Sequence, residues 1–192
     1  MKTTGLFFGS FNPIHTGHLI LANYMLSFAG LDEVWFVISP QNPFKIKESL
    51  LADHHRYYMV NMAVEDNPRF QACDIEFKMP RPSFTIDTLT WLNEKYPNRD
   101  FVLLMGSDQL PSFHKWKNYE RILEYYKIYI YPRPNGDQGE YSDHPSIKRF
   151  EAPLMDISST FLRDAIKNKK DVRYLIPDKV YQHILDMHFY ER

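Results

Sequence analysis

Short runs of consecutive apolar residues, each followed by a stretch with helical spacing, constrain the fold of this chain more than any other feature. Val34–Ile38 and Phe101–Met105 are apolar at every position, which is typical of strands buried on both faces. Ahead of the first run, Leu19, Ala22 and Met25 recur at helical spacing. Because parallel neighbours need a crossover, usually a helix, this alternation predicts an α/β fold: a Rossmann-like, doubly wound parallel sheet with helices on both faces.

The same patterns predict where each element lies. Strands are expected at 6–8, 34–38, 70–77, 101–105 and 128–131. Helices are expected at 16–30, 53–64, 83–95, 119–126, 160–168 and 177–188, and Gly30 is expected to cap the first of them. A chain of 192 residues with no internal repeat and no linker-like composition predicts one domain, residues 1–192.

Charge and apolar content exclude several classes of partner. Lys and Arg number 23 against 24 Asp and Glu, a net charge of -1, so no global field attracts nucleic acid or an anionic membrane. No apolar run reaches the roughly 18 residues of a membrane span, and Leu6–Phe8 is too short for a secretory signal. Cys73, the only cysteine, cannot form an intrachain disulfide. We therefore expect a soluble, cytoplasmic protein without nucleic acid or membrane partners.

The segment between the first expected strand and the first expected helix carries the clearest chemical signal. It reads GSFNPIHTGH from Gly9 to His18. A glycine lets the backbone approach a ligand, and a helix start offers unpaired N–H groups and a dipole that favours an anion. His15 and His18 are three positions apart on the first turn, so both can face one ligand. We interpret the segment as a phosphate-binding loop.

Other phosphate loops and reactive sites can be checked against the sequence directly. The chain has no Gly-x-Gly and no Gly-Lys-Ser/Thr, which excludes the dinucleotide fingerprint and the Walker loop. Gly-x-Ser-x-Gly is also missing, so no nucleophile for acyl transfer is indicated. Two histidines three apart without an obvious third ligand make zinc a weak option, and no protein metal site is predicted.

A second segment, ISSTFLR from Ile157 to Arg163, again places hydroxyl groups at an expected helix start. Arg163 falls one turn into that helix. Alone, the segment is typical of a serine cap followed by a surface arginine. Paired with the first segment, it predicts a second phosphate contact.

Together these two segments resemble the signature pair of the nucleotidyltransferase superfamily, Gly-x-Phe-x-Pro-x-His-x-Gly-His and Ile-Ser-Ser-Thr-x-x-Arg. Four further stretches are similar to the bacterial nicotinate mononucleotide adenylyltransferases: Arg81–Leu89, Gly106–Asp108, Phe113–Trp116 and Tyr174–Pro177. The chain departs from that family at three positions, with Phe8 for a glycine, Asn12 for an aspartate and Phe84 for a tyrosine. The resemblance implies a single nucleotidyltransferase domain.

The resemblance also implies a reaction and the residues that bind ATP. A phosphate oxygen of nicotinate mononucleotide would attack the α-phosphorus of ATP, giving nicotinate adenine dinucleotide, a step of NAD biosynthesis, and pyrophosphate. His18 would contact the α-phosphate with His15 beside it, and Lys45 would reach across from the next loop. By the same resemblance, the ATP-binding residues are Gly9, Ser10, Phe11, Gly106, Asp108, Ser159, Thr160 and Arg163. Mg2+ is expected to arrive with ATP, with phosphates and water as its main ligands.

For the acceptor, the resemblance implies that the pyridine ring lies against Trp116 and that its carboxylate lies near Thr85 and the backbone of Lys117. Two alternative interpretations of the function remain. The acceptor could instead be nicotinamide mononucleotide or pantetheine phosphate, which chain length and the Pro-Ser-Phe-Thr segment disfavour. A noncatalytic ATP sensor is a further alternative, which the intact His15, His18 and Arg163 disfavour.

Overall fold

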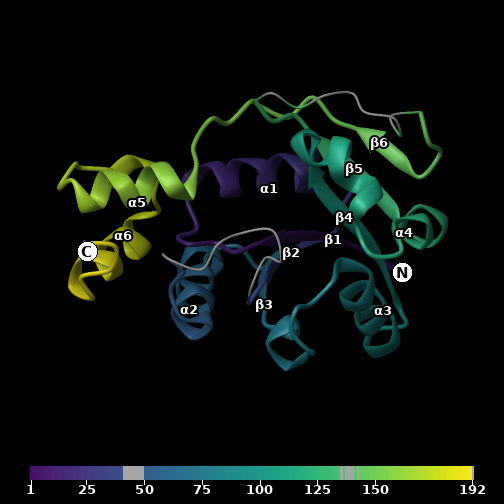
Figure 1. Ribbon diagram of the computed structural model, residues 1–192, viewed down its shortest axis with the longest axis horizontal. Coiled ribbons are helices and arrows are strands. Elements are labelled where there is room, and N and C mark those ends of the chain that lie inside the picture. Colours follow the sequence, from purple (N-terminus) through teal and green to yellow (C-terminus); the bar gives the residue numbers. More distant parts are fainter. Residues whose placement is uncertain (41–49, 135, 137–140, 142, 192) are drawn as a thin grey trace.

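One parallel sheet organises the molecule, in a computed structural model that describes residues 1–40, 50–134, 136, 141 and 143–191. Within these residues six strands, all parallel to their neighbours, follow the order β3-β2-β1-β4-β5-β6 (Figure 1). The strands are β1 (Lys2–Gly9), β2 (Glu33–Ile38), β3 (Phe70–Cys73), β4 (Arg99–Gly106), β5 (Lys127–Tyr131) and β6 (Ile147–Arg149). This arrangement confirms the predicted Rossmann-like, doubly wound sheet.

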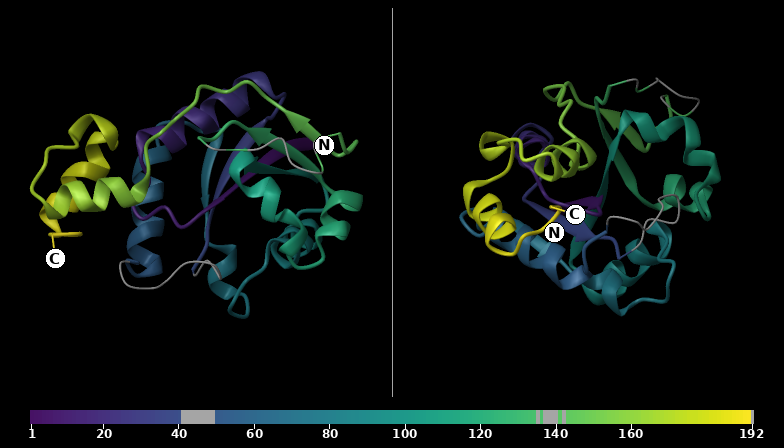
Figure 2. Two further views of the ribbon diagram at one scale, coloured as in Figure 1. Left: turned by 45° about the horizontal axis from the view of Figure 1, so that its top comes forward. Right: turned by 60° about the vertical axis from the view of Figure 1, so that its left-hand side comes forward.

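Helices cover both faces because successive strand side chains point to opposite sides. Phe7 of β1 and Phe36 of β2 belong to one core, and Leu6 and Trp35 beside them belong to the other. The first core also contains residues of α1 (Thr16–Phe28), α2 (Asp53–Val64), α5 (Ser159–Lys167) and α6 (Asp178–Asp186). The second core contains residues of α3 (Thr85–Lys95) and α4 (Tyr119–Tyr125). α6 lies beside α2 and contacts it, and both α5 and α6 lie far from β6 (Figures 1 and 2).

Most expected elements are confirmed, one expectation is wrong, and one strand is not predicted. The strand expected at 70–77 ends at Cys73, and a short 3₁₀ helix, η1 (Ile75–Lys78), follows it. The edge strand β6 was not expected, because a three-residue polar stretch carries no apolar run. Gly30 does follow the first helix with a left-handed φ of 71°. Two further 3₁₀ helices are η2 (Ser107–Lys115) and η3 (Arg173–Leu175).

The strand order places a ligand site at one edge of the sheet. The chain turns from β1 to β2 on one side and later returns to β4 on the other, so loops diverge at the carboxyl ends of β1 and β4. In open α/β sheets ligands bind at such a switch point.

No helix among the described residues is long and apolar enough to cross a membrane.

Candidate active site

A pocket of about 580 Å³ lies at the carboxyl ends of the strands. Residues from the loop after β1, from η2 after β4 and from the start of α5 line the same cavity. The predicted site residues that line it are Gly9, Ser10, Phe11, His15, His18, Thr85, Asp108, Trp116, Lys117, Ser159, Thr160 and Arg163. Residues far apart in the sequence thus meet at the switch point.

Two predicted site residues are not in that group. Gly106 does not line the pocket; its small size leaves room for the Asp108 carboxylate, with which a Cβ at residue 106 would collide. Lys45 lies outside the residues that the structure describes. Cys73 is buried and burial raises the pKa of its thiol to about 11, in line with a structural residue.

The loop after β1 needs its glycine because the backbone and an aromatic ring come close together. Phe11 has a left-handed φ of 45° and its side chain is buried beneath the loop. A Cβ at Gly9 would lie 2.9 Å from the Phe11 ring, closer than carbon atoms pack. The ring of Phe11 also meets the His18 ring edge-on, with centroids 5.1 Å apart. Phe11 therefore supports the loop and the histidine together.

His15 and His18 form a stacked pair at the start of α1. Their ring centroids are 3.7 Å apart, and the backbone N–H of His15 donates to Nδ1 of the His18 ring over 3.2 Å. His15 is 3% exposed, and its Nδ1 has no hydrogen-bond partner among the described residues. Burial, and secondarily the charge of Arg133, lowers the pKa of His15 to about 3. His15 is consequently a neutral imidazole near pH 7.

The second segment is bonded directly to the first. Ser159 Oγ donates to the Pro13 carbonyl over 2.9 Å, and Arg163 Nη1 donates to the Asn12 carbonyl over 2.8 Å. The serine cap is confirmed at Ser158, whose hydroxyl accepts from the Phe161 N–H over 3.2 Å. The start of α5 is therefore fixed against the loop that precedes α1.

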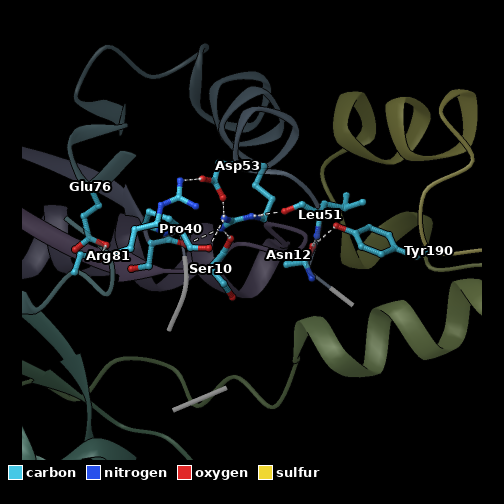
Figure 3. Close-up of polar contacts among 11 residues, drawn as sticks. Ser10, Asn12, Pro40, Leu51, Asp53, Glu76, Arg81 and Tyr190 are labelled. Carbon is cyan, nitrogen blue, oxygen red and sulfur yellow. Dashed lines mark hydrogen bonds and ion pairs between the residues drawn. The ribbon is translucent and has the colours of Figure 1, made fainter. Parts of the chain in front are cut away.

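Arg56, a residue of α2 that is 0% exposed, holds this loop from the other side, and sequence reasoning missed it. A guanidinium has five N–H donors, and here each has an acceptor. Nε donates to the Leu51 carbonyl over 3.0 Å. Nη1 donates to the carbonyls of Ser10 and Ser39 over 2.5 and 2.9 Å. Nη2 donates to the Pro40 carbonyl over 3.3 Å and to Asp53 Oδ1 over 2.6 Å. Figure 3 labels four of the acceptor residues, Ser10, Pro40, Leu51 and Asp53. The loops after β1 and β2 are thereby joined through one side chain.

Asn12 is a second anchor of the loop after β1. Its Oδ1 accepts from the Leu51 N–H over 3.2 Å and from the hydroxyl of Tyr190, near the other end of the chain, over 2.8 Å (Figure 3). Asn12 is 3% exposed. This departure from the family's aspartate suits a buried position, because an amide oxygen accepts these bonds without burying a charge.

The other half of the pocket is formed by the start of α3 and the end of η2. Thr85 begins α3, and Trp116 directly follows η2. Lys117 Nζ donates to both carboxylate oxygens of Asp87 over 3.0 and 2.8 Å and lies 4.9 Å from the centre of the Phe84 ring. An aromatic face beside a helix start offers a flat ring and an anion one place to bind.

Three charged residues that line the pocket are not predicted from the sequence: Lys115 at the end of η2, Arg133 and Glu76. Arg133, just beyond β5, lines the cavity and donates from Nη1 to the Met155 carbonyl over 3.1 Å. Glu76 in η1 also lines it, although only 3% of the residue is exposed. Arg133 could have been found from its place at a strand's carboxyl end, whereas Glu76 lay in a segment expected to be a strand.

These features define a class: an α/β protein with a nucleotide-sized pocket at the switch point of its sheet, lined by histidines, hydroxyls and arginines. A family model described as cytidylyltransferase-like matches residues 6–165. A protein of Cytophaga hutchinsonii, named "probable nicotinate-nucleotide adenylyltransferase", is 50% identical over 186 residues, 97% of each chain. A protein of Flavobacterium psychrophilum with the same name is 50% identical over 190 residues, 98% of each chain. The chain belongs to the cytidylyltransferase-like family, in its nicotinate-nucleotide adenylyltransferase branch.

Solved structures agree in fold. The Plasmodium falciparum nicotinic acid mononucleotide adenylyltransferase complexed with NaAD superposes with a TM-score of 0.82 at 21% identity, covering 100% of this chain and 98% of that one. The same protein complexed with APC gives a TM-score of 0.81 at the same identity and coverage. At this identity the likeness shows the fold alone.

Proposed function

We propose that this chain is a nicotinate-nucleotide adenylyltransferase, which transfers the adenylyl group of ATP to nicotinate mononucleotide in NAD biosynthesis. One observation carries the proposal most directly: His18 and Arg163, which lie on two separate segments, line one pocket. That arrangement suits a triphosphate held at several points. The curated relatives and the family match agree with this activity.

The reaction needs no nucleophile from the protein. A phosphate oxygen of nicotinate mononucleotide forms a bond to the α-phosphorus of ATP, the bond from that phosphorus to the bridging oxygen breaks, and pyrophosphate leaves with the electron pair. The protein must align the two substrates and stabilise the charge that develops on the transferring group. We assign that task to His18 and to the N–H groups at the start of α1, with Lys45 as a further contact from the next loop.

His15, being neutral, serves as a support for His18 and as a donor of at most one hydrogen bond. We assign Arg163, Ser159 and Thr160 to the phosphates that leave as pyrophosphate. Arg163 and Ser159 already donate to the carbonyls of Asn12 and Pro13. Arg163 keeps further N–H groups for ATP, whereas Ser159 has used its only hydroxyl hydrogen and can reach a phosphate through its backbone N–H at the start of α5. Arg133 adds a second guanidinium to the pocket.

Mg2+ enters as part of the ATP substrate in this proposal, and it would neutralise charge on the phosphate oxygens. The described residues contain no cluster of three or more His, Cys, Asp or Glu side chains arranged for a metal ion. Asp108 lines the pocket, and we place it near the ribose. Phosphate oxygens and water would therefore supply most of the Mg2+ ligands.

The acceptor is placed in the half of the pocket beside α3. The pyridine ring would lie against Trp116, and its carboxylate would meet Thr85 and the backbone of Lys117. Both substrates are small charged metabolites, so we place the reaction in the cytoplasm, with neither nucleic acid nor membrane as a partner.

An acceptor panel tests the proposal. Pyrophosphate release from ATP is measured in parallel with nicotinate mononucleotide, nicotinamide mononucleotide and pantetheine phosphate. We expect the highest kcat/KM with nicotinate mononucleotide. A preference for either other acceptor would refute the substrate assignment, and ATP binding without pyrophosphate release for any acceptor would favour the noncatalytic sensor.

A further inference from the structure

The acceptor half of the pocket contains a buried carboxylate, Glu76, whose role neither the reaction nor the resemblance explains. It lies in η1, directly after β3, at the wall of the cavity. Burial is the largest influence on the pKa of Glu76 and raises it, while bonds from nearby hydroxyls act in the opposite direction. A buried acidic group is costly unless it is well hydrogen-bonded.

Both oxygens of Glu76 are bonded to the acceptor segment, residues 81–88. Ser83 Oγ donates to Oε2 over 2.8 Å, and Thr88 Oγ1 donates to Oε1 over 2.8 Å. Ser83 is 9% exposed and Thr88 is 0% exposed, so these hydroxyls face the carboxylate rather than solvent. Ser83 and Thr88 are therefore used to hold the segment, and this leaves Thr85 between them for a ligand.

These two bonds enclose the start of α3. The Phe84 carbonyl accepts from the backbone N–H groups of Asp87 and Thr88 over 3.0 and 3.1 Å, which closes the first turn. The N–H groups of Thr85 and Ile86 precede that turn and have no partner within the helix. Phe84 supplies no side-chain cap. The direction of these two N–H groups is thus set by how the segment is held on either side.

We propose that Glu76 is the positioning residue for the acceptor: by holding Ser83 and Thr88 it fixes the start of α3 against Trp116. This inference rests on the proposed function, since it assumes that the acceptor binds in this half. It distinguishes Glu76 from a residue that is only structural, because losing it changes the affinity for the acceptor and not that for ATP.

The first experiment compares binding of the two substrates without turnover. Calorimetry measures the Kd of nicotinate mononucleotide, and separately that of a nonhydrolysable ATP analogue, for wild type and Glu76→Gln. An amide accepts at one oxygen only, so one of the two hydroxyls loses its acceptor. We expect the Kd of nicotinate mononucleotide to rise about tenfold and that of the analogue to change less than about twofold.

Three variants control for a loss of fold. Ser83→Ala and Thr88→Val each remove one donor, keep the carboxylate, and should each raise the Kd of nicotinate mononucleotide roughly threefold. Thr90→Val is the matched control on the same helix, because its hydroxyl donates to the Ile86 carbonyl over 2.9 Å and not to Glu76. Should Glu76→Gln fail to fold, the Ser83 and Thr88 variants carry the test.

Several results would overturn the inference. They are an equal rise in both Kd values, an unchanged or lower Kd for nicotinate mononucleotide in Glu76→Gln, and a rise in Thr90→Val as large as in Thr88→Val. The proposed function fails separately, if wild type releases no pyrophosphate with any acceptor. A wild type that turns over while its Glu76 variant shows no selective effect refutes only the positioning role.

Discussion

The two halves of the pocket are held together in different ways. The nucleotide half is the part assigned to ATP, formed by the loop after β1 and the start of α5. There, side chains of Arg56, Arg163 and Ser159 donate to backbone carbonyls of distant loops. In the acceptor half, side chains bond to other side chains, and the Lys117–Asp87 pair is 43% and 41% exposed. The first arrangement fixes the backbone itself, whereas the second fixes individual side chains.

The two arrangements differ in how well each half tolerates substitution without loss of the reaction. The transferring phosphate requires donors in fixed positions, and a loop held through its carbonyls depends less on its own side chains than one held through side chains alone. The wall that meets the acceptor depends on few side chains, so single substitutions there can change the affinity for one substrate. We therefore expect large effects in the nucleotide half and selective effects in the acceptor half.

The largest effect is expected for Arg56→Ala. It leaves the carbonyls of Ser10, Ser39 and Leu51, and the Asp53 carboxylate, without their buried donor. We expect the free energy of unfolding to fall by about 3–5 kcal/mol in urea denaturation at pH 7. Arg81→Ala is the control, because Arg81 is 55% exposed and bonds to the same Asp53. Arg81→Ala should lower the free energy of unfolding by less than about 1 kcal/mol. An equal loss in the two variants would contradict the special role of Arg56.

The next effect concerns turnover. His18→Ala should lower kcat by at least roughly a hundredfold, because a donor to the transferring phosphate is lost, while the Kd of an ATP analogue changes little. Stopped or coupled assays of pyrophosphate release measure it. Ser112→Ala is a fair control, since Ser112 lines the same pocket and its hydroxyl donates to the Gln109 carbonyl. A similar kcat in both variants would argue against a role for His18 in the chemical step.

A pH effect should be specific to the nucleotide half. The pKa of His15 is about 3 in the folded protein, whereas an ordinary histidine has a pKa of 6.5, so below pH 6.5 the unfolded chain binds a proton that the folded chain does not. Stability from this group is complete above about pH 6.5 and is lost as the pH falls towards 3. Between pH 8 and pH 5, wild type should lose about 2 kcal/mol more than His15→Asn. The measurement is the free energy of unfolding of both proteins from pH 8 to pH 5. An equal loss in wild type and His15→Asn would contradict a buried, neutral His15.

The smallest effect is expected at the acceptor wall. Trp116→Ala should raise the KM for nicotinate mononucleotide roughly three- to tenfold through lost ring contact, with the KM for ATP unchanged. Trp116→Phe keeps an aromatic face and should recover most of the affinity. If the KM for ATP rose as much as that for the acceptor, the division of the pocket into two halves would not hold.

Sequence patterns predict the sheet and the pocket better than they predict what holds the pocket in place. Strands such as Val34–Ile38 are apolar throughout, and the two signature segments predict residues that do line the pocket. Arg56 lies within HHRYY, which indicates a polar helix face, and nothing local shows that five acceptors surround it. β6 was missed because its pairing with β5 depends on backbone bonds rather than on apolar side chains. Partners distant in sequence leave no local signal.

The contact between Tyr190 and Asn12 has a consequence for how the site is completed during synthesis. The two residues are 178 positions apart, so the ribosome makes the loop first and its hydroxyl partner among the last residues described. A nascent or shortened chain ending at Asp186 contains every residue assigned to a substrate but lacks this anchor.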